Sequence, residues 1–391
     1  MAVTLASADN ALKTLYLDVV AEQLNKNVNP LLARIKQSTN DVWGKEVRKV
    51  ATYGVNGGVG AGSEDGALPK SAGNKYGQFV ATLKNLYGTI EISDKAIRAS
   101  EHNSGAFVNL LNDEMEGLIK ASSFNFGRML FGDGSGALAC VEEVMDNEIR
   151  IDTVKNLAEG MIIDVYDANS DYYPLQNRRI KAIDRSAKTV ILEGEELDDY
   201  SLSNGCILVL QGSHNKEITG LGAIFNEEAD MLYGLKTAEN RWLKPYINQI
   251  NTSITENAIQ KTIDTIEERS GSQVNFIVCS WGVRRALQKL FSENKRNLDV
   301  MELSGGFKAM SYNGIPIVAD RFCPAGTMYL LNTDDFTLHQ LCDWQWLADD
   351  DGKVLKQIPG KPVYTATLVK YAELMCSRPN GQGAILGIKE E

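Results

Sequence analysis

The spacing of hydrophobic positions changes several times along the chain, and each spacing predicts a different element. Between residues 104 and 131, apolar side chains recur every three or four residues, which predicts one helix of roughly 27 residues. Its apolar face is formed by Phe107, Leu110, Leu111, Met115, Leu118, Ile119, Phe126 and Leu130. Such a helix is about 40 Å long at 1.5 Å per residue, so we expect an extended sheet to cover that face.

Two strands are predicted before this helix, at residues 45–53 and 76–92, where Ile90 and Ile92 alternate with polar neighbours. Between them lies "YGVNGGVGAGSEDGALPKSAGNKYGQF", residues 53–79, which contains eight glycines and one proline. A stretch of this length without a periodic pattern is uncommon inside a compact domain. We predict that it is the tip of a long hairpin projecting from the body, where glycine supplies backbone freedom at low steric cost.

The remaining patterns predict an α+β protein. Residues 139–214 contain short strands at regular spacing, which predict a small inserted antiparallel β subdomain. Residues 250–292 predict helix, strand and helix, with a capping box at Ser253 and Glu256 and a helix end at Gly271. Residues 312–391 are mostly strand and turn. Residues 8–37 predict an amphipathic N-terminal arm whose apolar face is formed by Leu12, Leu15, Val19, Val20 and Leu24.

The composition argues against some classes of protein but does not indicate a function. The 391 residues are 43% hydrophobic and carry a net charge of −11, without the basic patch typical of a nucleic-acid binder. No apolar run is long enough to predict a membrane span, and the N-terminus lacks the pattern of a signal peptide, so we expect synthesis in the cytosol. The six cysteines are scattered, and we expect Cys279 and Cys323 to be buried.

No motif predicts catalysis, a cofactor or a metal. The letters "GDGSGA" at 132–137 match a dinucleotide-binding fingerprint, but they follow a helix instead of opening one, and Asp133 would repel phosphate. We therefore predict a helix-terminating turn there. The segment "GVGAG" at 58–62 is not followed by Gly-Lys-Ser/Thr, and no zinc spacing or nucleophile elbow is present. We predict a protein that is not an enzyme and has no cofactor.

Taken in order, the elements resemble the major capsid proteins of tailed bacteriophages with the HK97-type fold. The resemblance is carried by "YGQFVATLKNLYGTIEISDKAIRAS" (76–100), "GAFVNLLNDEMEGLIKASSFNFGRMLFGDGSG" (105–136), "EITGLGAIF" (217–225) and "YNGIPIVADRFCPAGTMYLLNTDDFTL" (312–338). It implies an N-terminal arm at 1–44, an E-loop hairpin at 45–92 and a P-domain with the spine helix at 93–138. It further implies an inserted β subdomain at 139–216, an A-domain at 217–328, and strands returning to the P-domain at 329–391.

The resemblance implies that the E-loop tip touches a neighbouring subunit. The residues expected in that contact are Gly57, Gly60, Gly62, Leu68, Lys70 and Lys75. Some members of the family join neighbours through a Lys–Asn isopeptide bond. No receiving Asn or catalytic Glu can be matched in this sequence, so that chemistry is not carried over.

The resemblance also implies partners: copies of the same chain in hexamers and pentamers of an icosahedral shell, a separate scaffolding protein, a portal and decoration proteins. The location would be the virion, after assembly in the host cytoplasm. Packaged double-stranded DNA would be contacted only weakly because the chain is acidic. Two alternatives stay open: an encapsulin-type nanocompartment shell, and an enzyme whose glycine-rich loop is a lid.

Overall fold

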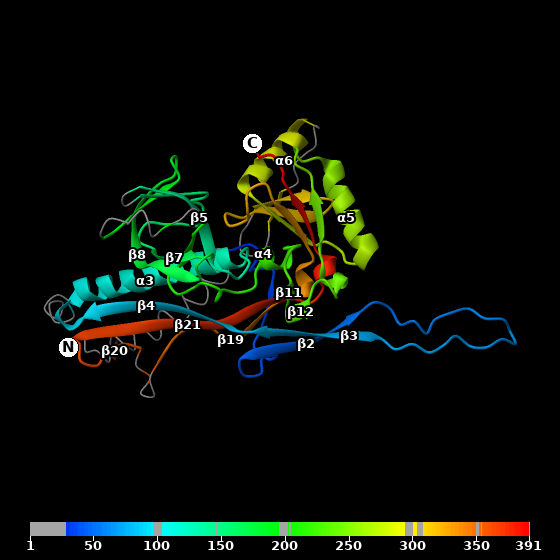
Figure 1. The fold of residues 1–391 in the computed structure, drawn as a ribbon, viewed down its shortest axis with the longest axis horizontal. Coiled ribbons are helices and arrows are strands. Elements are labelled where there is room, and N and C mark those ends of the chain that lie inside the picture. Colours follow the sequence, from blue (N-terminus) through cyan, green and yellow to red (C-terminus); the bar gives the residue numbers. More distant parts are fainter. Residues whose placement is uncertain are drawn as a thin grey trace.

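The computed structural model describes residues 29–96, 104–145, 148–194, 205–293, 300–302, 308–348 and 354–390, with residues 202 and 352. These ranges form a five-stranded sheet, a seven-stranded sheet, a closed six-stranded barrel and two two-stranded ribbons. The two large sheets and the barrel make up the body of the molecule, and one ribbon extends far beyond it (Figure 1).

The five-stranded sheet is the base of the molecule, and the long helix lies along it (Figure 1). Its strands are β1 (Lys36–Ser38), β19 (Phe336–Trp346), β21 (Val363–Cys376), β20 (Lys356–Gln357) and β4 (Lys84–Ser93). Helix α3 (Ser104–Met129) buries Met115, Ile119 and Phe126 against this region. A Cβ on Gly88 of β4 would lie 2.9 Å from Cδ1 of Leu118, so glycine allows the helix to approach closely. The long helix and its covering sheet are confirmed.

The seven-stranded sheet carries two helices and a core of its own. Its order is β13 (Tyr246–Gln249), β22 (Gly383–Leu386), β18 (Met328–Leu331), β14 (Phe276–Cys279), β17 (Ile315–Ala319), β16 (Lys308–Tyr312) and β15 (Val300–Glu302). Helices α5 (Glu256–Ser270) and α6 (Trp281–Glu293) bury Ile259, Ile266 and Leu287 in that core.

The two ends of α5 give one correction and one confirmation. The expected capping box is wrong, because the N-cap is Thr255, whose hydroxyl accepts from the Ala258 amide at 3.1 Å. The expected helix end at Gly271 is confirmed by its left-handed φ of 65°.

The inserted β subdomain is a closed antiparallel barrel. Its strands are β5 (Ala137–Met145), β6 (Glu148–Ile151), β7 (Ile162–Asp167), β8 (Tyr172–Asp184), β9 (Thr189–Leu192) and β10 (Ile207–Leu210). Inward side chains such as Val141, Ile151, Ile163 and Leu208 fill a core separate from those of the two sheets. Closure leaves the barrel with no free sheet edge.

Sheet order corrects two expectations about strands. We expected residues 76–92 to belong to the projecting hairpin, but the chain divides there into β3 (Lys75–Thr82), which pairs with β2 (Glu46–Tyr53), and β4, which pairs with β21. We also expected every strand of 329–391 to return to the P-domain. Instead, β22 lies in the seven-stranded sheet between β13 and β18.

Other expectations have mixed outcomes. Cys279 and Cys323 are fully buried, as expected. Most of the predicted N-terminal arm, residues 1–28, lies outside the described residues. Among the helices that are described, none is both long and apolar enough to cross a membrane. The proposed domain boundaries remain predictions.

Candidate functional site: the projecting arm

The glycine-rich segment forms the outer part of a hairpin arm. Strands β2 and β3 pair without interruption from Glu46↔Thr82 to Tyr53↔Lys75, and residues 54–74 continue beyond them as the tip. The tip extends well away from the rest of the molecule (Figure 1). Gly54 opens it with a φ of 72°, a left-handed conformation that glycine adopts without strain.

Aromatic side chains hold the base of the arm on the body. The ring of Tyr53 stacks on Trp242 at 4.7 Å between centroids, and buried Phe79 contacts both Trp242 and Tyr233. A Cβ on Gly77 would lie 3.0 Å from the Trp242 ring, so glycine allows the indole to approach the strand closely. The base is therefore a preorganised platform for the tip.

Inside the tip, the two chain segments run side by side. The Asn56 side-chain amide donates to Oδ1 of Asn74 at 3.1 Å, and the Gly58 amide donates to Oδ1 of Asn56 at 2.9 Å. A Cβ on Gly57 would lie 3.1 Å from Cβ of Ala72, and one on Gly60 would lie 3.1 Å from Cγ of Pro69. These glycines therefore permit close approach of the two segments, which is a more specific role than backbone freedom alone.

The residues predicted to touch a neighbour all lie on this arm and are all exposed. Gly57, Gly60, Gly62, Leu68 and Lys70 are in the tip, and Lys75 is the first residue of β3. Their role in a subunit contact stays a prediction.

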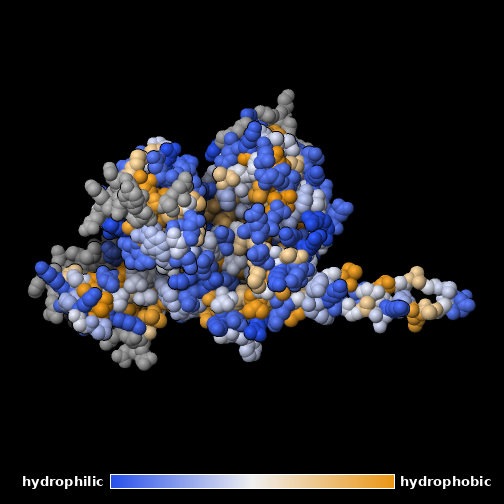
Figure 2. Space-filling model, in the orientation of Figure 1, coloured by the Kyte–Doolittle hydropathy of each residue, from blue (hydrophilic) through white to orange (hydrophobic). Residues whose placement is uncertain are grey.

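The tip also exposes large apolar side chains. Val55, Val59 and Leu68 are 90%, 88% and 89% exposed. Figure 2 shows apolar side chains along the arm beyond the body. Burial of a Val or Leu side chain is worth about 1.5–3 kcal/mol, so a partner surface that covered these residues would be bound by them.

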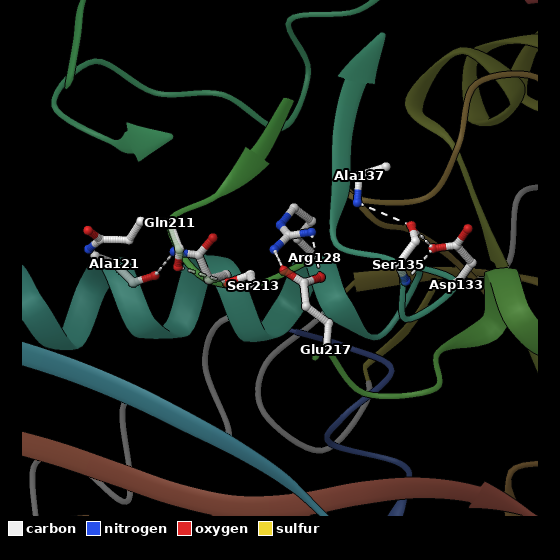
Figure 3. A network of polar contacts seen from close by, with 9 residues as sticks. Ala121, Arg128, Asp133, Ser135, Ala137, Gln211, Ser213 and Glu217 are labelled. Carbon is white, nitrogen blue, oxygen red and sulfur yellow. Dashed lines mark hydrogen bonds and ion pairs between the residues drawn. The ribbon is translucent and has the colours of Figure 1, made fainter. Parts of the chain in front are cut away.

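A buried ion pair closes the stem of the barrel, and sequence reasoning missed it. Arg128 near the end of α3 donates from Nη1 to Oε2 of Glu217 at 2.8 Å, and a second hydrogen bond joins Nη2 to Oε1 (Figure 3). Both side chains are almost fully buried. The pair joins the segments that enter and leave the barrel, which are 89 residues apart. No local pattern signals a contact over such a separation.

The turn at 132–137 has the structural role expected for it. Helix α3 ends at Met129, and Gly134 and Gly136 have φ values of 88° and 82°. The Asp133 carboxylate accepts from the Ser135 amide at 2.9 Å and so caps its own turn (Figure 3).

Two further buried charges lie in the base sheet. Lys370 on β21 donates to Oδ1 of Asp343 at 2.6 Å and to Oε1 of Gln340 at 2.7 Å, and its burial lowers the pKa of the amine. Glu373, also on β21, accepts from the amides of Thr219 and Leu374. Burial raises the pKa of Glu373 to about 7, and these two hydrogen bonds oppose the rise only in part.

Metal chemistry gains no support from the geometry. Across the part of the chain that the structure describes, no three His, Cys, Asp or Glu side chains are grouped so that they could hold an ion. His339 lies buried in β19, and burial lowers its pKa.

Known proteins resemble this chain in sequence over part of its length and in fold over most of it. Residues 210–354 match the family model described as SU10 major capsid protein. No curated protein sequence matches the chain. The solved structure of the cyanophage A-1(L) capsid asymmetric unit is similar over 96% of this chain and 93% of that one, with 13% identity and a TM-score of 0.54.

Two other structures are similar at lower scores. The capsid of Myoviridae phage XM1 has 9% identity and a TM-score of 0.48, and covers 93% of this chain and 92% of its own. The SrpI encapsulin of Synechococcus elongatus PCC 7942 also has 9% identity, with a TM-score of 0.46 over 93% and 89%. The family match is therefore confined to residues 210–354, and the likeness to the cyanophage capsid structure shows that the chain has the HK97-type fold.

Proposed function

We propose that the chain is the major capsid protein of a tailed bacteriophage, a structural protein of a multi-subunit shell, and that its arm holds neighbouring subunits of the shell together. The supporting observation is the tip itself, which exposes Val55, Val59 and Leu68 and has no core of its own. A two-stranded ribbon is marginally stable alone, so covering its apolar side chains in an assembly would offset the cost of ordering it. Gly57, Gly60, Gly62, Leu68, Lys70 and Lys75 are the proposed contact residues.

The assembled shell is proposed to be an icosahedral virion head, built from hexamers and pentamers, that encloses double-stranded DNA. The net charge of −11 fits a lining that repels the packaged polymer weakly and does not retain it. A scaffolding protein, a portal and decoration proteins are the proposed partners, and the host cytoplasm is the proposed place of assembly. An encapsulin-type compartment is the alternative, supported only by the shared shell fold.

Limited trypsin digestion of the unassembled and assembled protein tests the arm. In the free subunit we expect rapid cleavage after Lys70, because the tip is exposed and makes few contacts. In closed shells, seen by electron microscopy and sized by light scattering, the same cut becomes slow. Cleavage at equal rates in both states would contradict docking of the tip.

A matched pair of variants separates docking of the tip from nonspecific association through exposed apolar residues. Leu68→Ser is expected to impair shell formation, whereas Met145→Ser, an exposed apolar residue on the barrel, is the control. The content of purified shells distinguishes the two kinds of compartment, because nucleic acid favours a phage head and a co-purifying protein cargo favours the encapsulin alternative.

A further inference from the structure

Asn-Gly pairs occur in the sequence at residues 56–57, 204–205, 313–314 and 380–381. In such a pair the backbone nitrogen of the glycine can attack the side-chain amide of the asparagine, because glycine has no Cβ to hinder the approach. The two atoms must meet in one geometry, so the fold around each pair decides how readily they react. Three of the pairs lie wholly within the described residues, and their surroundings differ.

Two of these pairs are held in rigid surroundings. The Asn313–Gly314 pair forms the tight turn between β16 and β17, with φ values of 50° and 80°, and the Asn313 amide donates to Oε1 of Gln260 at 3.1 Å. The Asn380–Gly381 pair lies in the short helix η3 (Pro379–Gly381), where the glycine is buried. At both places the backbone must open locally before the side chain and the glycine nitrogen can meet.

The Asn56–Gly57 pair in the arm tip is far less restrained. Both residues are exposed, and residues 54–74 form no helix or strand. The Gly58 amide donates to Oδ1 of Asn56 at 2.9 Å, so the asparagine side chain is folded back over the Gly57 peptide. This closure keeps the side-chain carbonyl carbon, Cγ, close to the peptide whose nitrogen would attack it, and the donor on Oδ1 draws electrons away from Cγ.

One further hydrogen bond holds the amide group that would leave. Nδ2 of Asn56 donates to Oδ1 of Asn74 at 3.1 Å, across the two segments of the tip. Both side chains are exposed, so water can replace this hydrogen bond at little cost. Asn74 therefore orients the Asn56 side chain without shielding it.

We propose that Asn56 is a site of spontaneous modification, at which the asparagine is converted into aspartate and isoaspartate. The Gly57 nitrogen gives up its proton to solvent and bonds to Cγ of Asn56, while Nδ2 takes up a proton and leaves as ammonia. Water then adds to one of the two carbonyl carbons of the resulting cyclic imide. Cleavage of the bond between Cγ and nitrogen gives aspartate, and cleavage of the backbone bond between carbon and nitrogen gives isoaspartate.

Either product changes the tip. Aspartate has no amide donor for Oδ1 of Asn74, and it adds a negative charge. Isoaspartate also adds one carbon to the backbone, at the place where a Cβ on Gly57 would lie only 3.1 Å from Cβ of Ala72. The two tip segments then lose their close fit. This inference goes beyond the proposed function, and it does not depend on shell assembly.

Incubation of the unassembled full chain, followed by tryptic digestion and mass spectrometry, tests the proposal. Between Lys49 and Lys70 the sequence holds no other Asn or Gln, so the mass gain of exchanging an amide NH2 for OH belongs to Asn56. The same digest reports Asn313 and Asn380 as internal controls. We expect conversion at Asn56 to be faster than at either control by about tenfold or more. It should also be faster at pH 8 than at pH 6, because the attacking nitrogen must lose its proton.

The chain unfolded in guanidinium chloride gives the reference rate for each pair. There the three pairs should react at similar rates, since glycine follows each asparagine. Folding should slow Asn313 and Asn380 and leave Asn56 close to its unfolded rate. Slowing of Asn56 to the level of the two controls would overturn the proposal, as would a lack of conversion in the folded chain.

The variant Asn56→Gln tests the mechanism of attack. It keeps a side-chain amide but must close a larger ring, so conversion in this peptide should be much slower than in the unaltered chain. Equal conversion in the two proteins would reject attack by the Gly57 nitrogen.

Discussion

The arm and the barrel both project from the body as paired chain segments. Of the two, the barrel has a hydrophobic core of its own. Inside the barrel, Val141, Ile151, Ile163 and Leu208 are buried among one another. On the arm tip, Val55 and Leu68 are about as exposed as side chains can be. The barrel can therefore hold its shape by its own packing, whereas the apolar side chains of the arm tip stay exposed in the single chain.

The two stems differ as sharply as the two projections. The barrel stem is closed by a buried ion pair between Arg128 and Glu217, which demands a defined geometry. The arm stem is held instead by aromatic packing of Tyr53 and Phe79 on Trp242. The bidentate ion pair thus restricts the geometry of the barrel stem more than ring stacking restricts that of the arm stem.

Removing the ion pair at the stem of the barrel is expected to have the largest effect on the stability of the free subunit. Arg128→Met leaves Glu217 buried without its partner, so the free energy of unfolding should fall by about 3–5 kcal/mol. Arg128→Met combined with Glu217→Leu should recover most of that loss, because neither charge then remains buried. Urea denaturation of the unassembled subunit measures both. Equal losses in the single and double variants would contradict the view that the unpaired, buried Glu217 is what destabilises Arg128→Met.

Truncating one buried side chain of the barrel core tests whether the barrel unfolds independently of the two large sheets. Ile163→Ala should cost about 2–5 kcal/mol, as expected for a fully buried side chain. Hydrogen exchange should then accelerate within 137–210 and change little in the two large sheets. The matched variant Leu68→Ala on the arm should change stability by less than about 0.5 kcal/mol. Loss of protection spread evenly over the molecule would contradict the comparison.

Glu373 predicts a pH dependence for the region where the barrel's return segment meets the base sheet. Its folded-state pKa of about 7 lies above the ordinary glutamate pKa of 4.5, so the folded protein keeps a proton that the unfolded chain releases. Stability should therefore fall as pH rises from about 4.5 to about 7, by about 3 kcal/mol at most, and level off above that.

Glu373→Gln is the variant that isolates this group. It keeps an oxygen to accept from the Thr219 and Leu374 amides, and it should remove most of the fall. Some slope should remain from Asp320, whose pKa burial raises to about 6. Denaturation midpoints measured from pH 5 to pH 8 supply the comparison, and identical slopes in the two proteins would exclude Glu373 as the source.

The smallest effect is expected from glycine replacement in the tip. Gly57→Ala places a Cβ 3.1 Å from that of Ala72 and should push the two tip segments apart slightly. Gly73→Ala meets nothing within 4 Å and is the control. The free subunits should be equally stable, and only shells of Gly57→Ala should melt at a lower temperature by calorimetry. Equal melting temperatures of the two kinds of shell would show that the close approach at Gly57 is not needed for shell stability.

Sequence patterns were sufficient where a structure depends on local spacing. The long helix follows from apolar residues such as Met115, Ile119 and Phe126 at helical intervals, and the inserted β subdomain follows from short strands separated by turns. The glycine-rich segment was recognised as an arm because nothing in it could form a core. The division of 76–92 into β3 and β4 was missed, since alternation continues through Leu83 and does not reveal which partner each half takes.

Contacts between distant segments were decided only by the tertiary structure. The pairing of Arg128 with Glu217, the stacking of Trp242 on Tyr53 and the place of β22 between β13 and β18 join residues far apart in the chain. Local propensity contains no information about such partners, because their energy arises only once the chain has closed the loops between them. The sequence by itself therefore determined the kinds of element and the presence of an arm, and the tertiary structure decided what anchors the arm and which of its apolar side chains remain exposed.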